Sequence, residues 1–357
     1  MDITQLLHFA VQQDASDLHL SAGEPPMIRV HGDMKKIKVP PLAAEQTHAM
    51  LYDIMADTQR KIFEERSDID FSMQLGEIAR FRVNVFRQNR GIGGVFRRIP
   101  TQILSLDDLR MPAVLADISR RERGLVLVTG PTGSGKSTTL AAMIDLINSE
   151  LEGHILTVED PIEFVHQSRK CLVNQREVGP HTQSFNNALR AALREDPDII
   201  LVGELRDLET IQLALTAAET GHLVLGTLHT SSAPKTVDRI IDVFPPNQQA
   251  QVRAMFAESI QAIVTQTLCR RVGGGRVAAV EIMLGTPAVR NLIREGKIHQ
   301  LPGVLQTSQG VGMQTLEMHL RELVDRNLIT RETAIEKTGN PDLFREQDLA
   351  LAGGKRR

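Results

Sequence analysis

The residues best suited to chemistry in this sequence form a glycine-rich segment that ends in a lysine and hydroxyl side chains. Glycines let the backbone turn sharply, so that successive N–H groups can point at phosphate oxygens. The lysine supplies a positive charge for β- and γ-phosphates, and the serine hydroxyl after it is a ligand for Mg²⁺. We therefore predict a site for ATP with Mg²⁺. Its predicted residues are Gly130, Pro131, Thr132, Gly133, Ser134, Gly135, Lys136, Ser137 and Thr138.

The segments on either side of these residues make a chance match improbable. An apolar run at 125–129 precedes the loop, and a helical pattern at 138–148 follows it. A strand, a glycine-rich loop and a helix in this order are the context that a phosphate-binding loop requires. The positive N-terminal end of the helix would add to the attraction for phosphate.

Acidic side chains follow a second apolar run, 155–158. Carboxylates at the carboxyl end of a parallel strand face the crevice where ligands bind in open α/β sheets. Glu163, with Glu159, is predicted to hold Mg²⁺ through water, together with Ser137, or to orient the attacking water. The alternatives are solvated loop acids and, for Asp160, a cap of a turn or helix.

Glu204 follows a third apolar run, 199–202. This position suits a residue that polarises water for attack on the γ-phosphate or that holds the metal. A surface glutamate is the weaker interpretation, because four apolar residues deliver it to the mouth of the loop. Arg206 and Asp207 are predicted to pair across a subunit interface.

Two histidines, His222 and His229, flank a fourth apolar run at 223–227. Seven residues of extended chain separate their Cα atoms by roughly 23 Å, so they cannot share a metal. His229 is the candidate for sensing the γ-phosphate through a hydrogen bond. His222 is interpreted as a structural or interface residue.

Arginines crowd two predicted neighbouring strands, 79–88 and 91–99. They can form a solvated or nucleic-acid-facing surface, but no aromatic side chains interleave with them as a base-stacking platform would require. The alternative is arginine fingers, cationic groups that a neighbouring subunit brings to the γ-phosphate. The arginines are Arg80, Arg82, Arg87, Arg90, Arg97 and Arg98.

Composition narrows the class of protein. The chain has 357 residues, 41% of them apolar, a net charge of -3 and a pI near 6.4, which argues against a strongly cationic nucleic-acid binder. Cys171 and Cys269 lie far apart, which favours a reducing compartment. We find no apolar run long enough to span a membrane and no signal-peptide pattern. The predicted location is the cytoplasm.

Strand patterns predict two domains. Residues 1–99 indicate an α+β domain with an antiparallel sheet and a helix at about 43–57. Residues 100–112 are a predicted linker with proline near both ends, able to hinge. Apolar runs separated by helices over 113–357 predict a parallel sheet covered on both faces, followed by a hairpin of 264–271 with 276–284. The fold class is therefore α/β with a smaller α+β domain.

Four motifs in one order resemble the secretion and type IV pilus ATPases. They are the loop at 130–139, the acidic segment at 158–163, the run from Arg194 to Glu204, and the histidine segment at 220–230. The resemblance implies a RecA-like hexameric ATPase with a PAS-like N-terminal domain. It also implies that Arg82 and Arg97 reach a neighbour's nucleotide, with the adjacent Arg98 as the alternative to Arg97.

Within that family the chain is most similar to the retraction motors. It lacks a four-cysteine zinc insert, and the segment Ala288–Lys297 is similar to a C-terminal helix signature of those motors. The resemblance implies pilus disassembly and twitching motility, with an inner-membrane platform protein as partner at the cytoplasmic face. The alternatives are an extension or secretion ATPase of the same family, a motor stimulated by nucleic acid, and a scaffold that binds nucleotide without hydrolysing it.

Overall fold

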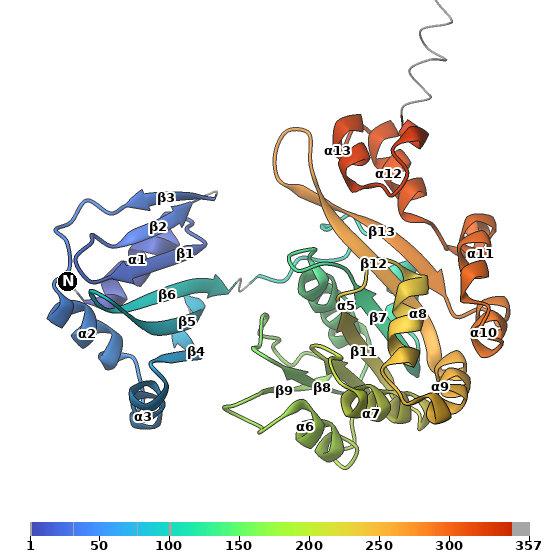
Figure 1. Cartoon of the computed structure of the whole chain (residues 1–357), viewed down its shortest axis with the longest axis horizontal. Coiled ribbons are helices and arrows are strands. Elements are labelled where there is room, and N and C mark those ends of the chain that lie inside the picture. The colour runs from blue at the N-terminus through green and yellow to red at the C-terminus, as the bar shows by residue number, and fades with distance from the viewer. Residues whose placement is uncertain (1, 31, 77, 100–101, 345–357) are drawn as a thin grey trace, which may run out of the picture. The chain divides into compact units, whose positions relative to one another are not determined.

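The computed structural model describes residues 2–30, 32–76, 78–99 and 102–344, in two compact units, Met1–Gln102 and Ile103–Arg357 (Figure 1). Positions 100 and 101 of the predicted linker lie outside the described residues. From Ile103 onward that linker belongs to the second unit, and its Leu106 and Met111 are buried in the core of that unit. A hinge between the units stays a prediction.

The first unit is an antiparallel sheet with the strand order β3-β2-β1-β6-β5-β4. Three helices supply Leu7, Leu51 and Phe63, one each, to the core on one face of this sheet. The second of these helices lies close against the sheet, since a Cβ on Gly94 would lie 2.6 Å from Leu51 Cδ2. The elements are α1 (Ile3–Gln12), β1 (Asp17–Ser21), β2 (Met27–Val30), β3 (Asp33–Lys36), α2 (Ala44–Asp53), α3 (Asp57–Arg66), β4 (Asp68–Leu75), β5 (Ala79–Gln88) and β6 (Gly91–Ile99).

The second unit is built on a seven-stranded sheet with the order β13-β12-β7-β11-β10-β8-β9. Every neighbouring pair is parallel except β12 with β13. The predicted parallel sheet and terminal hairpin are therefore confirmed. The strands are β7 (Gly124–Thr129), β8 (His154–Glu159), β9 (Leu172–Glu177), β10 (Ile199–Val202), β11 (Leu223–Leu228), β12 (Ile260–Arg270) and β13 (Arg276–Leu284).

Helices cover both faces of this sheet. Successive residues of β7 point to opposite sides, so that Leu127 belongs to one hydrophobic core and Val126 and Val128 to another. The first core contains residues of α6 to α9, and the second contains residues of α4 and α5. The helices are α4 (Val114–Ser119), α5 (Lys136–Glu150), α6 (Phe185–Ala192), α7 (Leu208–Glu219), α8 (Ala233–Asp242), α9 (Pro246–Ser259), α10 (Pro287–Arg294), η1 (Ile298–Gln300), α11 (Leu301–Thr307), η2 (Gln309–Val311), α12 (Leu316–Asp325) and α13 (Arg331–Lys337).

Several boundaries differ from the prediction. The helix expected to reach residue 57 ends at Asp53, and β12 begins at Ile260 rather than 264, directly after α9. Two strands, β3 and β9, were not predicted. Both lie at a sheet edge, and the side chains of β3 are all exposed, so neither shows the continuous apolar pattern of a buried strand.

Candidate functional site

The phosphate loop lies between the end of β7 and the start of α5. Three of its glycines have positive φ, at 142° for Gly130, 76° for Gly133 and 89° for Gly135. Side chains other than glycine rarely adopt such angles. Gly135 caps α5, whose first residue is Lys136. The nine predicted nucleotide-binding residues thus form one continuous loop and the first turn of the helix.

Lys136 is buried at the mouth of this loop. Its Nζ donates to the carbonyl oxygens of Gly130 at 2.9 Å and Pro131 at 3.2 Å, and it lies 3.4 Å from Nδ1 of His229. Burial lowers the pKa of the Lys136 ammonium, against the opposing influence of Glu204 and Glu163. Two acidic side chains from two other strand ends therefore lie close enough to act on the lysine.

Glu204 extends the same set of contacts. One of its carboxylate oxygens lies 3.3 Å from Nε2 of His229 and the other 2.8 Å from Arg206. Burial opposes ionisation of Glu204, but Arg206 and His229 outweigh it and hold the pKa below its usual range. A neutral His229 protonated at Nε2 satisfies both neighbours, because Nε2–H donates to Glu204 and Nδ1 accepts from Lys136.

The acidic segment after β8 separates into two roles. Glu159 accepts hydrogen bonds from Thr157 Oγ1 at 2.7 Å and Gln175 Nε2 at 3.2 Å. Burial raises the pKa of Glu159 despite these bonds. Glu163 is exposed, with its backbone N–H 3.4 Å from the Glu159 carboxylate. Glu163 is therefore the carboxylate that is available to a metal or water, whereas Glu159 shapes the loop.

Three other predicted residues have structural partners within the chain. Asp207 caps α7 by accepting from Thr210 N at 2.9 Å. Arg206 pairs with Glu204 within the chain, and the predicted pairing of Arg206 and Asp207 across a subunit interface stays a prediction. Nδ1 of His222 donates a hydrogen bond to the carbonyl of Ala217 at 2.9 Å, close to the end of α7. This contact is consistent with the structural interpretation of His222.

The arginines of the first unit divide between the two faces of its sheet. Arg82 and Arg97 are directly opposite each other on β5 and β6, whereas Arg98 is opposite the buried Phe81. Arg98 binds Asp14 at 2.9 Å. The register therefore places Arg82 beside Arg97 on the face away from the helices.

Asp17 lies beside this arginine pair, a position that the sequence pattern did not predict. Asp17 is 5% exposed. Its carboxylate accepts hydrogen bonds from Nε of Arg97 at 2.9 Å and from the Ser16 hydroxyl at 2.8 Å, and it lies 4.0 Å from Nε of Arg29. Asp17 is the cross-strand partner of both Arg97 and Arg29. The alternation of polar and apolar residues in β1 indicates a strand, but it does not show that this strand pairs with β6 and so places Asp17 beside Arg97.

A hollow of about 480 Å³ adjoins the phosphate loop. Leu109 and Met111 contribute from the segment before α4, Thr138 from α5, and Leu268 from β12. Its walls are partly apolar and partly polar, which suits a base and a sugar. Because Gly135 and Thr138 are among the residues that line it, this hollow is the candidate for the nucleoside.

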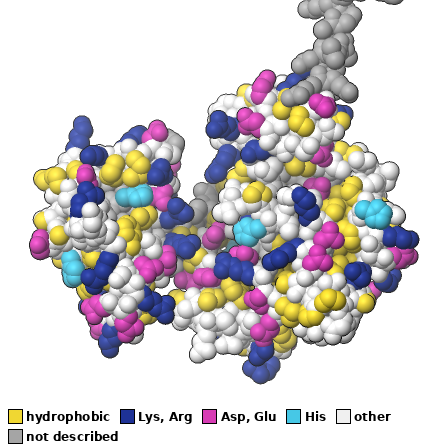
Figure 2. All heavy atoms as spheres, viewed as in Figure 1, with side chains coloured by type: hydrophobic (Ala, Val, Ile, Leu, Met, Phe, Trp, Pro, Cys, Tyr) yellow, Lys and Arg dark blue, Asp and Glu magenta, His cyan; other side chains and the backbone are white. Residues whose placement is uncertain are grey.

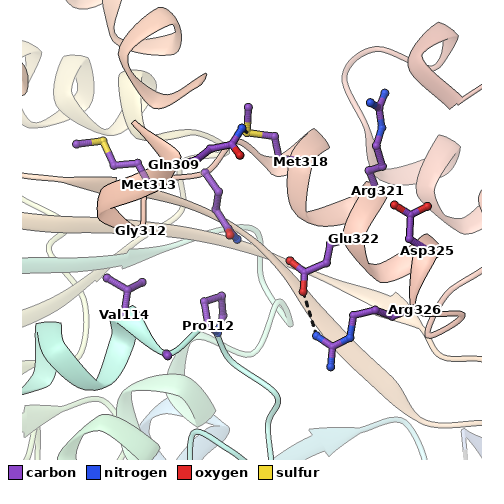
Figure 3. A pocket seen from close by; sticks show the side chains of 12 residues that line it. Pro112, Val114, Gln309, Gly312, Met313, Met318, Arg321, Glu322, Asp325 and Arg326 are labelled. Carbon is purple, nitrogen blue, oxygen red and sulfur yellow. Dashed lines mark hydrogen bonds and ion pairs between the residues drawn. The ribbon is translucent and has the colours of Figure 1, made fainter. Parts of the chain in front are cut away.

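A second hollow, of about 680 Å³, is lined by different elements (Figure 3). Met313, Met318 and Val114 form part of its wall, with the ion pair of Glu322 and Arg326 at one side. None of the predicted site residues lines it, so we do not assign it to the nucleotide. Within the described part of the chain, no cluster of three or more histidine, cysteine or acidic residues is arranged to hold a metal.

Comparisons with known proteins point in one direction. The family described as type II/IV secretion system protein matches residues 1–333. A Pseudomonas aeruginosa protein, the type IV pilus retractation ATPase PilT, is 63% identical over 344 residues, covering 96% of this chain and 100% of that protein. A Neisseria gonorrhoeae twitching motility protein is 58% identical over 318 residues, covering 89% of this chain and 85% of the relative.

Among solved structures, the pilus retraction motor PilT with bound ADP aligns with a TM-score of 0.91 at 47% identity, covering 96% of this chain and 98% of the other. This match confirms the predicted fold class, a RecA-like α/β core with a smaller α+β N-terminal domain. No helix in the described ranges is long and apolar enough to span a membrane.

Proposed function

The chain belongs to the type II/IV secretion system protein family, and on that premise we propose that it is an ATPase that drives retraction of type IV pili. The observation that carries the proposal is the chain of contacts from Lys136 through His229 to Glu204 at the phosphate loop. The direction of work is supported by two relatives, one named for pilus retraction and one for twitching motility. These names favour retraction over extension or secretion within the family.

ATP binds with its phosphates on Gly130–Ser137 and its nucleoside in the hollow beside Thr138. The loop amides and the N-terminal end of α5 bind the phosphate oxygens, and Lys136 neutralises the β- and γ-phosphates. The oxygen donors of Ser137 and Glu163 suit Mg²⁺, which prefers a few carboxylate or hydroxyl ligands completed by phosphates and water. When bound, the ion would offset the charge that develops on the phosphates.

Hydrolysis uses Glu204 as the residue that orients and polarises water. The water oxygen attacks the γ-phosphorus, the bond to the bridging oxygen of ADP breaks, and the proton of the water moves toward the carboxylate. An ionised carboxylate is needed for this, and the lowered pKa of Glu204 supplies one at neutral pH. His229 joins Glu204 to Lys136, so it is placed to report on the γ-phosphate.

Arg82 and Arg97 complete the pocket of a neighbouring copy in a hexameric ring. Their common face supports this role, because both guanidinium groups can reach one phosphate from the same side of the sheet. Their side chains are 47% and 69% exposed, as residues that bind in trans must be.

Release of phosphate removes the charge that holds the two domains closed, and the predicted hinge between them reopens. Sequential closure around the ring turns an inner-membrane platform protein and returns pilin subunits from the filament to the membrane. The motor works in the cytoplasm, at the inner membrane, through these partners.

A nucleic-acid motor on the same core is less well supported. On the face of the molecule seen in Figure 2, basic and acidic side chains are interspersed rather than gathered into a continuous basic surface. The net charge is -3. Such a motor would show polynucleotide-stimulated hydrolysis with strong salt dependence.

The experiment that tests the proposal is Glu204→Gln, with Glu209→Gln as the matched control. Both changes remove one carboxylate, but Glu209 lies on α7, where it pairs with Arg190 and Asn186. We expect E204Q to bind ATP and lose turnover, while E209Q retains it. Turnover by E204Q close to that of the unmodified protein would refute the assignment.

A further inference from the structure

Gln266 lies in the middle of β12 and touches the phosphate loop from behind. It is 2% exposed, although both of its polar atoms are used. Its Nε2 donates to the backbone carbonyl of Ser134 at 2.6 Å, and its Oε1 accepts from the Thr139 hydroxyl at 2.9 Å. A carbonyl can only accept, so the contact with Ser134 fixes which end of the amide points to the loop. One side chain thus connects the loop to the first turns of α5.

The bond to Ser134 determines where the next backbone N–H points. In a planar trans peptide the carbonyl and the N–H of the following residue point in opposite directions. With the Ser134 carbonyl held toward Gln266, the N–H of Gly135 points away from the Gln266 amide. This N–H belongs to the set that a phosphate-binding loop turns toward its anion.

The backbone of Gln266 limits the loop as well. A Cβ on Gly130 would lie 2.2 Å from the Gln266 carbonyl oxygen, and a Cβ on Gly135 would lie 3.1 Å from Nε2. The loop therefore packs against β12 at both of these glycines. β12 continues into the hairpin with β13, in register from Ala262 with Leu284 to Arg270 with Arg276. The loop is supported by this hairpin as well as by its own strand and helix.

We propose that Gln266 is a positioning residue for nucleotide binding, which orients the phosphate loop through Ser134 and Thr139. The inference rests on the proposed function, since it assigns the support of the same site. It predicts that loss of the amide weakens binding of the phosphates more than binding of the nucleoside, although Gln266 also lines the hollow assigned to the nucleoside.

The test compares Gln266→Leu with Thr265→Val in the full-length assembled protein. Leucine keeps much of the volume and removes both hydrogen bonds. Thr265 is the neighbouring residue on β12. It is also buried, but its side-chain hydrogen bond joins it to Thr129 at 2.8 Å rather than to Ser134 or Thr139. The Kd of Mg-ADP is measured by titration calorimetry, and the Kd of adenosine by ligand-observed NMR. The thermal unfolding temperature of each variant is measured without nucleotide to compare their stabilities.

We expect Q266L to weaken ADP binding by about tenfold or more, the effect of one or two lost buried hydrogen bonds. The loss for adenosine should be clearly smaller than the loss for ADP, about threefold at most. T265V should bind ADP within about threefold of the unmodified protein. Hydrogen exchange in the segment 130–137 should rise in Q266L alone. Should Q266L fail to fold, Gln266→Glu keeps the acceptor for Thr139 and loses the donor to Ser134, and it should show the same loss for ADP.

Unchanged ADP affinity in Q266L, or in Q266E where Q266L does not fold, would overturn the proposal. An equal loss in T265V would overturn it too, because the effect would then follow general destabilisation of β12. These outcomes are distinct from failure of the proposed function, in which the unmodified protein itself would neither bind ADP nor hydrolyse ATP.

Discussion

Arg97 and Arg98 are adjacent in sequence but lie on opposite faces of their sheet, and this difference gives a sharp prediction. Arg97 uses Nε to bind Asp17 at 2.9 Å, which leaves its terminal nitrogens for a phosphate. Arg98 uses a terminal nitrogen to bind the exposed Asp14. We expect Arg97→Ala to impair hydrolysis in the ring and Arg98→Ala to spare it.

The magnitude follows from what each arginine does. An arginine supplied to phosphoryl transfer contributes about 10³- to 10⁵-fold in turnover. Arg82 lies beside Arg97 and can supply part of the same positive charge. We therefore expect R97A to lower turnover by about 10²- to 10³-fold, or roughly 3–4 kcal/mol of transition-state stabilisation. R98A breaks a surface ion pair worth about 0.2–1 kcal/mol of folding stability, with turnover within about twofold.

The assay is steady-state ATP turnover of the assembled particle, with light scattering to show that each variant still forms it. ADP affinity, measured in parallel, separates a loss of binding from a loss of chemistry. Loss of turnover in R98A together with full turnover in R97A would contradict this prediction, because the sheet register would then have identified the wrong face.

Three further predictions concern the second unit. His229→Ala should reduce turnover about tenfold or more while ADP still binds, because Glu204 loses a hydrogen-bond partner. Rapid-quench kinetics measure the rate of hydrolysis, and a binding titration measures the affinity for ADP. Burial lowers the pKa of His166 to about 4, so the folded state excludes a proton that the unfolded chain takes up below pH 6.5. The contribution of neutral His166 to the free energy of unfolding is present above pH 6.5 and falls by about 3 kcal/mol between pH 6.5 and pH 4. Urea unfolding at a series of pH values measures this fall, and His166→Gln should reduce it. Gly130→Ala should abolish ADP binding in calorimetry, because its φ is 142° and its Cβ would lie 2.2 Å from the Gln266 carbonyl.

The parts that could be predicted from sequence are those with a local signal. The loop at 130–138 has its residue types, spacing and flanking elements within one short stretch. The strand before Glu204 is buried on both faces, so its apolar run identified it and placed the carboxylate at its end.

The parts that could not be predicted depend on pairing between distant segments. Gln266 is 132 residues from Ser134, and only the parallel pairing of β12 with β7 brings them together. Asp17 is 80 residues from Arg97 and meets it through the register of β1 with β6. The same register separates Arg97 from Arg98, a distinction that adjacency in sequence left open.

If each ATP pocket is completed by an adjoining copy, mixing two inactive variants should restore activity. Arg97→Ala and Glu204→Gln proteins, co-expressed with different tags and purified through both, would form mixed rings. A pocket with Glu204 from one copy and Arg97 from the next is intact, which random mixing gives at about one interface in four. We predict that mixed rings regain turnover, up to about a quarter of that of the unmodified protein, although each variant alone is inactive. Mixed rings as inactive as their parents would contradict a pocket shared between subunits.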